Sequence, residues 1–419
     1  MFLLVIFFAL TVLPLPAQEL LSAEDSITAG ADNAPGLGSR AAALMDAATG
    51  AVLFSKNPDE VIPPASLAKL MTIHVALKEA AAGNASLDEA VELPRQSWAV
   101  NQPRRSSLMF LAAGQRVTLR ELLLGLAIPS GNDAAVAIAL RFAPSIEVFV
   151  EKMNAEARAL GLSRTQFVEP SGISEYNFTT ALEFAFFCRE YLRLHPETLQ
   201  EFHAVPEFAY PKAENVAEAY RANPGTIVQQ NHNRLLDIEE TGGYKNSGFV
   251  EGVDGLKTGY IDEAGYNIAL TAERRGTRLI AVILGAPAAY GGERIRDEDG
   301  RKLLTWGFDN FKTLSPVIEP PSPVRVWKGK TGSVPIALGE ETAFTTFTNR
   351  GNRLYSKIEM ASPLSAPLPA ASRVGSLVLY DDKGELRRIP LITTENVEQG
   401  GFFKRLWDGI QLFARDIFR

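Results

Sequence analysis

The stretch Pro63-Pro-Ala-Ser-Leu-Ala-Lys-Leu-Met-Thr72 contains the only Ser-x-x-Lys pattern in this chain of 419 residues. The two prolines punctuate the chain, and a helical pattern follows from about residue 65 to 82. Residues three apart on a helix share a face, so we expect Ser66 and Lys69 to lie side by side. A lysine in this position can accept the serine proton if burial or nearby cations lower its pKa. Free backbone N–H groups at the start of the helix can help to hold an oxyanion beside Ser66.

A second polar pattern, Ser130-Gly-Asn132, links two helical runs at about 119–128 and 132–142. Its side chains can therefore project from a short turn. A hydroxyl there can relay a proton to a leaving amine, and an amide can hold both a lysine and a substrate carbonyl. The alternative is a turn that only caps the helix at Asn132, and Ser55-Lys-Asn57 shows that Ser-x-Asn also occurs elsewhere in this chain.

A third pattern, Lys-Thr-Gly, occurs twice, at 257–259 and 330–332. The first copy continues from Tyr260 into sheet-like sequence, which favours a strand that presents the Lys257 cation and the Thr258 hydroxyl to a substrate carboxylate. Gly259 would let a ligand approach the backbone closely. The second copy lies in Trp327-Lys-Gly-Lys-Thr-Gly332, which is typical of a hairpin turn.

The surrounding sequence predicts an α+β domain. Residues 40–54 have the pattern of a hairpin, and the later apolar runs 265–272 and 277–285 have the pattern of strands. Strands before and after a helical region, on one sheet, imply α+β layering. Further helices are predicted at about 145–160, 180–194 and 293–313.

The composition changes at the Pro-rich linker 314–323. Short alternating stretches then run to about residue 394 and predict a small all-β domain. In the last segment, apolar residues recur at helical spacing beside a polar face with an excess of basic residues, which favours a helix lying in a membrane interface. The alternative is a helix docked on the protein's own body. The predicted anchor residues are Phe402, Phe403, Leu406, Trp407, Ile410, Phe413 and Ile417.

The N-terminal run Met1–Leu13 is apolar but too short for a lasting membrane span. Pro14, Pro16 and Ala17 follow, as expected of a signal peptide, and an uncleaved anchor is the alternative. Either way the body of the protein is exported, to the periplasm or the extracytoplasmic membrane face. The predicted divisions are 1–23 (signal peptide and leader), 35–313 (catalytic domain), 314–397 (all-β domain) and 398–419 (anchor helix).

Composition excludes several classes of function. The formal net charge is −7 and the body of the chain has no basic patch, which argues against a nucleic-acid partner. The single cysteine, Cys188, excludes an intrachain disulfide and lies in an apolar run that predicts a buried helix face. The histidines have no zinc-ligand spacing, and no Gly-x-Ser-x-Gly elbow occurs, so we expect neither a metal nor a Ser-His-Asp site.

The order Ser-x-x-Lys, Ser-x-Asn, Lys-Thr-Gly resembles that of the penicillin-recognising serine enzymes. The flanking sequences narrow the resemblance to the D-alanyl-D-alanine carboxypeptidases, which are low-molecular-mass penicillin-binding proteins. The resemblance runs from about residue 35 to the end. The stretches that carry it are Ala65–Thr72, Ser107–Leu111, Pro129–Ala134, Asn231–Leu236, Gly255–Tyr260 and Gly400-Gly-Phe-Phe403.

The resemblance implies a serine β-lactamase/DD-peptidase-like antiparallel sheet flanked by helices, then a small all-β domain and a C-terminal amphipathic helix. It also implies roles. Ser66 would attack the carbonyl between two D-alanines of a peptidoglycan stem peptide or a β-lactam, and Lys69 would be the general base. Ser130 and Asn132 would complete the proton network, with no cofactor. Lys257 would tune the electrostatics of the site, Thr258 would bind the terminal carboxylate, and the N–H groups of Ser66 and Tyr260 would form the oxyanion hole.

The chain departs from the family at two positions. Ile261 stands where many relatives have Thr, and His232 stands where some have Arg, near the substrate carboxylate. His232 is either a pH-dependent substitute for that arginine or a structural residue. The alternatives for the whole chain are a DD-endopeptidase, a β-lactamase, which shares the fold and motifs, and a catalytically silent envelope-binding protein.

Overall fold

The computed structural model describes residues 34–237, 248–319, 323–361 and 363–417. The predicted signal peptide and leader at 1–23 lie outside these residues. The chain divides into two compact units, one that ends at Phe308 and one from Asp309 to Arg419. Each unit is described below by itself.

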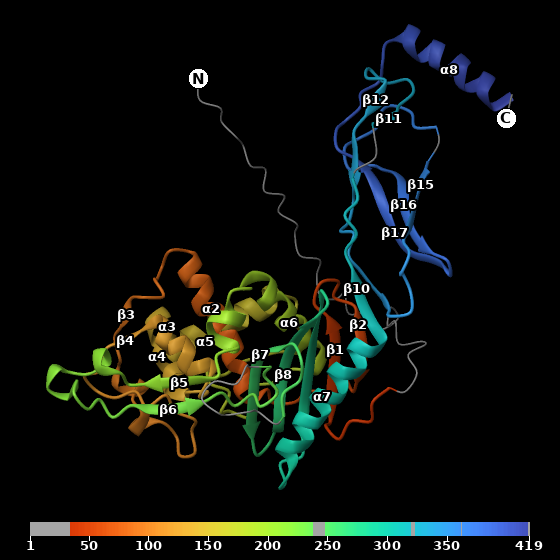
Figure 1. Cartoon of the computed structure of the whole chain (residues 1–419). Coiled ribbons are helices and arrows are strands. Elements are labelled where there is room, and N and C mark those ends of the chain that lie inside the picture. The colour runs from red at the N-terminus through yellow and green to blue at the C-terminus, as the bar shows by residue number, and fades with distance from the viewer. Residues whose placement is uncertain (1–33, 238–247, 320–322, 362, 418–419) are drawn as a thin grey trace. The chain divides into compact units, whose positions relative to one another are not determined.

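The first unit is built on a five-stranded antiparallel sheet with the order β2-β1-β9-β8-β7 (Figure 1). Strands β1 (Ala41–Asp46) and β2 (Val52–Lys56) form the predicted hairpin. Strand β1 also pairs with β9 (Thr277–Ala286), which pairs with β8 (Gly265–Arg274), and β8 pairs with β7 (Val253–Ile261). Segments from the two ends of the unit therefore share one sheet, and the predicted α+β class is confirmed.

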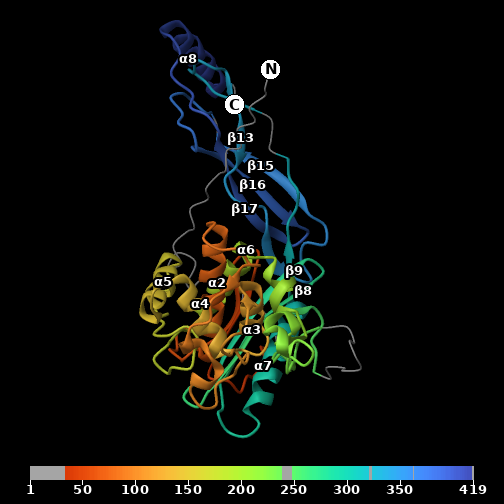
Figure 2. The ribbon, with the colours of Figure 1, turned by 90° about the vertical axis from the view of Figure 1, so that its left-hand side faces the viewer.

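Alternate side chains of β1 point to opposite faces of this sheet, as the period of a strand requires. Ala43 and Met45 belong to the main core with the helices on one face. Leu44 points to the other face, where a Cβ on Gly307 of α7 (Gly292–Asn310) would lie 2.8 Å from it. Figures 1 and 2 show α7 on this second face. The glycine therefore lets the helix approach the sheet closely.

The helices of the main core follow the predicted ranges closely. They are α2 (Ala68–Ala81), α3 (Leu119–Ala127), α4 (Asn132–Phe142), α5 (Ile146–Ala159) and α6 (Ala181–Leu194). Thr118 and Glu121 form a capping box at α3, and the side chains of Ser145 and Thr180 cap α5 and α6. Cys188 is buried in α6 and burial raises the pKa of its thiol, as expected of a core residue.

Short elements connect the helices to the sheet. Strands β3 (Ala90–Val91) and β4 (Val117–Thr118) pair, as do β5 (Glu207–Tyr210) and β6 (Ile227–Gln230). A π-helical turn spans Leu199–His203. The 3-10 turns are Ala65–Leu67, Arg95–Ser97, Ala99–Asn101, Ala213–Asn215 and Glu218–Tyr220.

The second unit is the predicted all-β domain followed by a helix. A four-stranded sheet has the order β13-β17-β16-β15, and two further pairs are β10–β14 and β11–β12. The predicted helix 293–313 ends at Asn310, because the chain continues as β10 and pairs with β14. The strands are β10 (Phe311–Leu314), β11 (Val324–Arg325), β12 (Ser333–Val334), β13 (Ile336–Leu338), β14 (Phe344–Phe347), β15 (Tyr355–Met360), β16 (Arg373–Asp381) and β17 (Gly384–Thr393).

The second Lys-Thr-Gly copy, 330–332, lies in the connection between β11 and β12, as its turn-like sequence predicts. Lys330 is an exposed residue paired with Glu398. The C-terminal helix α8 (Phe402–Ile417) contacts the β-domain through polar groups. Asp408 is buried, accepts hydrogen bonds from the Lys328 backbone N–H at 2.6 Å and from the Lys404 Nζ at 2.8 Å, and so fixes one face of α8.

The apolar side chains of α8 remain exposed. Phe403 is 83% exposed and Phe413 is 69% exposed, and Phe402, Leu406, Trp407 and Ile410 are each more than half exposed. Ile417 ends the helix, but its side chain lies outside the described part of the chain. Among the described residues, no helix is long and apolar enough to cross a membrane.

Asp299 of α7 links the start of the first unit to its last helix, which gives a test of the fold. Its buried carboxylate accepts hydrogen bonds from the Gly38 N–H, the Ser39 N–H and the Ser39 hydroxyl, at 3.1, 2.8 and 2.6 Å. We expect Asp299→Ala to lower the free energy of unfolding by about 1–3 kcal/mol, because these donors lose their acceptor. Urea denaturation measures this change. The control Glu298→Ala, at an exposed neighbour, should change it by less than about 0.5 kcal/mol. Equal stability of the two variants would contradict this account.

Candidate active site

Ser66 stands in the 3-10 turn Ala65–Leu67, immediately before α2. The sequence predicted Ser66 at the N-terminus of a helical run from about residue 65; in the structure the α-helix itself begins at Ala68, after a turn in which Ala65 has a left-handed φ of 51°. Such a conformation costs free energy in a residue other than glycine and persists only where the surroundings hold it. The turn that presents the serine is therefore held by its neighbours.

Two glycines provide these neighbours. A Cβ on Gly172, whose φ is 82°, would lie 1.9 Å from the Ala65 carbonyl oxygen and 2.9 Å from the Ser66 nitrogen. A Cβ on Gly259 of β7 would lie 3.0 Å from the Ser66 nitrogen and 3.0 Å from the Pro64 carbonyl oxygen. We expected Gly259 to leave room for a ligand. In the structure, the closest neighbour of its backbone is the Ser66 turn itself.

Lys69 is fully buried and its amine lies within hydrogen-bonding distance of three acceptors. The Nζ atom is 2.9 Å from Ser66 Oγ, 2.8 Å from Asn132 Oδ1 and 2.5 Å from the Ser171 carbonyl oxygen. Burial lowers the pKa of Lys69 to about 7, although the carboxylates of Glu169 and Asp133 oppose the shift. A substantial fraction of the amine is therefore neutral near pH 7 and able to accept a proton from Ser66.

Asn132 begins α4, and its amide nitrogen donates to Ser106 Oγ at 3.1 Å while its oxygen accepts from Lys69. Ser130 lies in the turn before it, with a φ of 62°. The Ser130 hydroxyl is buried and has no hydrogen-bond partner among the described residues. A buried hydroxyl without a partner is costly, which fits a group whose partner arrives with the substrate.

Strand β7 brings Lys257 and Thr258 to the same region, since it packs directly against the Ser66 turn. Both side chains are buried, and Lys257 Nζ donates to the Thr258 carbonyl oxygen at 3.1 Å. Burial, then the charges of Lys69 and Arg296, hold the pKa of Lys257 well below its ordinary value. Basic side chains from separate elements therefore lie close together on the β7 side of the serine.

His232 is exposed as a residue, but partial burial of its ring, together with the charges of Lys257 and Arg296, lowers its pKa to about 4. It is therefore neutral at pH 7, and it does not replace an arginine as a permanent cation. Sequence reasoning missed Arg296, a buried residue of α7 whose charge affects both Lys257 and His232. An arginine in a charged helix gives no sequence signal that it lies near a strand from a distant part of the chain.

The loop after α5 was also missed, although it supplies the Ser171 carbonyl. The Glu169 carboxylate organises it by accepting from the backbone N–H groups of Ser171 and Gly172, both at 2.7 Å, and from the Asn177 amide at 2.6 Å. This local network fixes the direction of the carbonyl that holds Lys69. Its signal in the sequence is only an acidic residue followed by Pro-Ser-Gly, which is typical of many turns.

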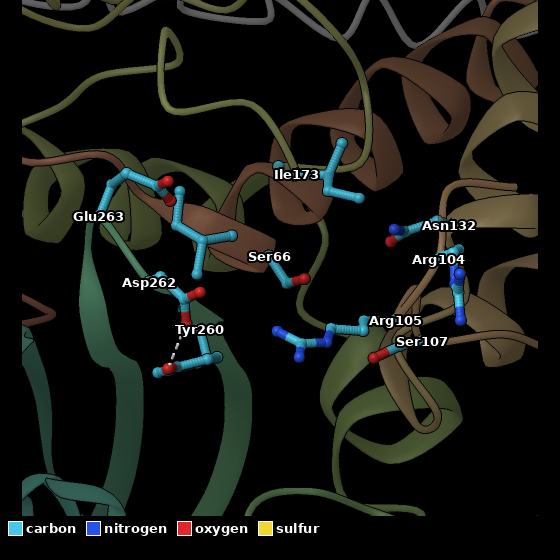
Figure 3. A pocket seen from close by; sticks show the side chains of 11 residues that line it. Ser66, Arg104, Arg105, Ser107, Asn132, Ile173, Tyr260, Asp262 and Glu263 are labelled. Atoms are coloured by element: carbon cyan, nitrogen blue, oxygen red, sulfur yellow. Dashed lines mark hydrogen bonds between the residues drawn. The ribbon is translucent and has the colours of Figure 1, made fainter. Parts of the chain in front are cut away.

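A cavity of about 250 Å³ opens beside Ser66 (Figure 3). Asn132, Gly172, Ile173, Tyr260 and Ile261 line it together with charged residues from two segments. The Tyr260 hydroxyl donates to Asp262 at 2.6 Å. Of the residues predicted for the site, Lys69 is hydrogen-bonded to both Ser66 and Asn132. The segments around these three carry the other predicted residues, which are Ser130, Lys257, Thr258, Gly259, Tyr260 and His232. The described residues contain no group of His, Cys, Asp and Glu arranged to hold a metal ion.

Comparison with known proteins identifies this arrangement. The family model of D-alanyl-D-alanine carboxypeptidases matches residues 28–288, and that of the penicillin-binding protein 5 C-terminal domain matches residues 312–399. The chain belongs to the D-alanyl-D-alanine carboxypeptidase family. The resemblance stated from sequence is confirmed, and the chain is an enzyme of this class.

Individual relatives support the assignment over most of the length. D-alanyl-D-alanine carboxypeptidase DacC of Escherichia coli is 36% identical over 385 residues, which cover 90% of this chain and 89% of the relative. The crystal structure of penicillin-binding protein 5 from Haemophilus influenzae has a TM-score of 0.74 and 29% identity, covering 88% of this chain and 99% of that chain. Penicillin-binding protein D2 from Listeria monocytogenes, in its ampicillin-bound form, has a TM-score of 0.53 and 29% identity, covering 65% and 100%.

The close contact between Gly172 and the turn that carries Ser66 can be tested by substitution. We expect Gly172→Ala to slow labelling by a fluorescent penicillin at least about tenfold, because the added methyl must displace the turn that carries Ser66. Gly83→Ala is the control. Gly83 has a similar φ of 81°, but a Cβ there meets nothing within 4 Å. Both variants carry the strain of a positive φ, so equal labelling rates would contradict the role of the Gly172 contact.

Proposed function

We propose that this enzyme removes the terminal D-alanine from peptidoglycan stem pentapeptides through an acyl-enzyme on Ser66. The observation that carries the proposal is the buried Lys69 amine, 2.9 Å from Ser66 Oγ and with a pKa of about 7. This pair supplies a nucleophile and a proton acceptor without a histidine. Because a general base works best when its pKa is near the working pH, burial of Lys69 is suited to this task.

In the first step, Ser66 Oγ bonds to the carbonyl carbon between the two D-alanines while Lys69 accepts the hydroxyl proton. The backbone N–H groups of Ser66 and Tyr260 stabilise the oxyanion. The Ser130 hydroxyl passes a proton to the nitrogen of the departing D-alanine, and the C–N bond breaks. Asn132 orients Lys69 throughout. Water then attacks the ester, and the proton that it loses reprotonates Ser66 through Lys69, which regenerates the enzyme.

The terminal carboxylate of the substrate is held on the β7 side. The Thr258 hydroxyl binds it, and the charge of Arg296 attracts it beside the buried Lys257 amine. Neutral His232 contributes a hydrogen bond rather than a charge at pH 7. A β-lactam carries a carboxylate and a reactive amide carbonyl, so the same groups lead to covalent acylation of Ser66 by the antibiotic.

We further propose that the enzyme is exported and attaches to the membrane surface through α8. Support comes from the helix itself, whose Asp408 contacts the β-domain while its aromatic and aliphatic side chains face outward. Lys404, Arg405 and Arg415 add positive charge beside this apolar face. Apolar insertion combined with attraction to anionic lipids is how amphipathic helices bind an interface.

The reaction is tested with a synthetic stem pentapeptide that ends in D-Ala-D-Ala. We expect mass spectrometry to show the loss of one alanine with the wild type and none with Ser66→Ala, because the substitution removes the nucleophile. Ser55→Ala is the matched control, since Ser55 is exposed on β2 and belongs to the other Ser-x-Asn sequence. Alanine release by Ser66→Ala, or rapid turnover of penicillin instead of a persistent ester, would contradict the proposal.

Membrane attachment is tested by flotation of the full-length protein with vesicles that contain anionic phospholipid. We expect the double variant Phe403→Ser with Phe413→Ser to weaken binding by at least about tenfold per residue, because each substitution removes a phenyl ring from the apolar face. Tyr355→Ser, at an exposed aromatic residue of β15, is the control and should bind as the wild type does. Undiminished flotation of the double variant would refute the role of α8.

A further inference from the structure

The cavity beside Ser66 has charged walls of opposite sign. Arg104 and Arg105 stand on one side, and Asp262 and Glu263 stand on the other. Figure 3 shows Ser66 between Arg105 and the two acidic residues. All four charged residues are exposed, so they are accessible to a ligand that enters the cavity.

These charges are largely unused by the protein. Among the described residues, Arg104, Arg105 and Glu263 form no ion pair, and the Asp262 side chain accepts a hydrogen bond from the Tyr260 hydroxyl. Several other arginines of this unit pair with carboxylates, as Arg278 does with Asp254 at 2.9 Å. Two unpaired cations opposite unpaired acids, across a cavity that contains the nucleophile, favour a ligand that carries both signs of charge.

The arginine side of the cavity is held by residues at the start of α4, and the acidic side is held by the turn after β7. The arginine wall continues into residues 106–111, where the Asp133 carboxylate accepts from the Met109 and Leu111 N–H groups at 2.8 and 3.0 Å. Asn132 bonds to this segment as well, through Ser106 and Ser107. The acidic wall is the tight turn between β7 and β8, closed by the Ala264 N–H donating to the Ile261 carbonyl at 3.2 Å. A ligand bridging the walls would therefore be positioned relative to Ser66.

The charged cavity is separate from the groups assigned to the terminal carboxylate. Lys257, Thr258 and His232 are not among its lining residues. If the departing D-alanine lies toward those groups, the acyl side of the substrate extends into the cavity. An extended chain advances about 3.5 Å per residue, so the residue that precedes the two D-alanines reaches these walls with its side chain.

We propose that this cavity selects the third residue of the stem peptide by its zwitterionic side chain, that of a diamino dicarboxylic acid. Glu263, with Asp262, binds the side-chain ammonium. Arg105, with Arg104, binds the side-chain carboxylate. The inference rests on the proposed carboxypeptidase function and specifies which substrates that function prefers.

The test uses three pentapeptides that end in D-Ala-D-Ala and differ only at the third residue, which is norleucine, lysine or meso-diaminopimelate. The measurement is kcat/KM for alanine release by the full-length enzyme. We expect the wild type to prefer lysine over norleucine and diaminopimelate over lysine, each by about two- to fivefold, the effect of one exposed ion pair. Glu263→Gln should reduce the lysine-to-norleucine ratio, and Arg105→Gln should reduce the diaminopimelate-to-lysine ratio.

Matched controls are Glu92→Gln and Arg95→Gln, two exposed residues of the same unit that do not line the cavity. Both should keep the wild-type ratios. The inference would be overturned if the wild-type ratios were near one, or if Glu263→Gln and Arg105→Gln left the ratios unchanged. In either case, release of alanine would still support the proposed function. Failure of the wild type to release alanine from any of the peptides would instead contradict the proposed function, and the inference with it.

Discussion

The site depends on keeping the Lys69 amine buried beside the Ser66 hydroxyl. Removing an amine from water disfavours its charged form, and hydrogen-bond acceptors must replace the lost water. The acceptors come from separate segments, namely the serine turn, the start of α4 at Asn132 and the loop that ends in Ser171. Because these segments meet only in the folded core, the tertiary structure itself produces a lysine that can act as a base at neutral pH.

The same constraint explains why glycine and charge are distributed as they are. Gly172 and Gly259 allow two backbones to press against the serine turn, and the second of these brings the Lys257 strand to the site. The charges of Lys257 and Arg296 lower the pKa of His232, and those of Lys69 and Arg296 lower the pKa of Lys257. The glycine contacts therefore place the Ser66 turn next to the buried lysines.

Much of this could be predicted from sequence because the signals are local. The helices carry apolar periodicity and Ser or Thr caps, and the Ser66 to Lys69 spacing already brings the two side chains together. The missing parts depend on contacts between distant residues. The left-handed Ala65, the Glu169 loop, Arg296, and the opposition of Arg105 to Glu263 arise from packing between segments that no periodicity connects. For α8, the sequence left membrane and protein contacts as alternatives, and in the structure its polar side docks while its apolar side stays exposed.

We propose that neutral Lys69 is the proton acceptor for Ser66, and the pH dependence of acylation tests this role most directly. Lys69 has a lowered pKa, so its neutral form is depleted as the pH falls below about 7. The rate constant for acylation by a penicillin should therefore rise with pH, change by about tenfold per pH unit below the pKa, and level off above about 7. A rate that is constant from pH 5 to 9, or that falls as the pH rises through 7, would contradict the account.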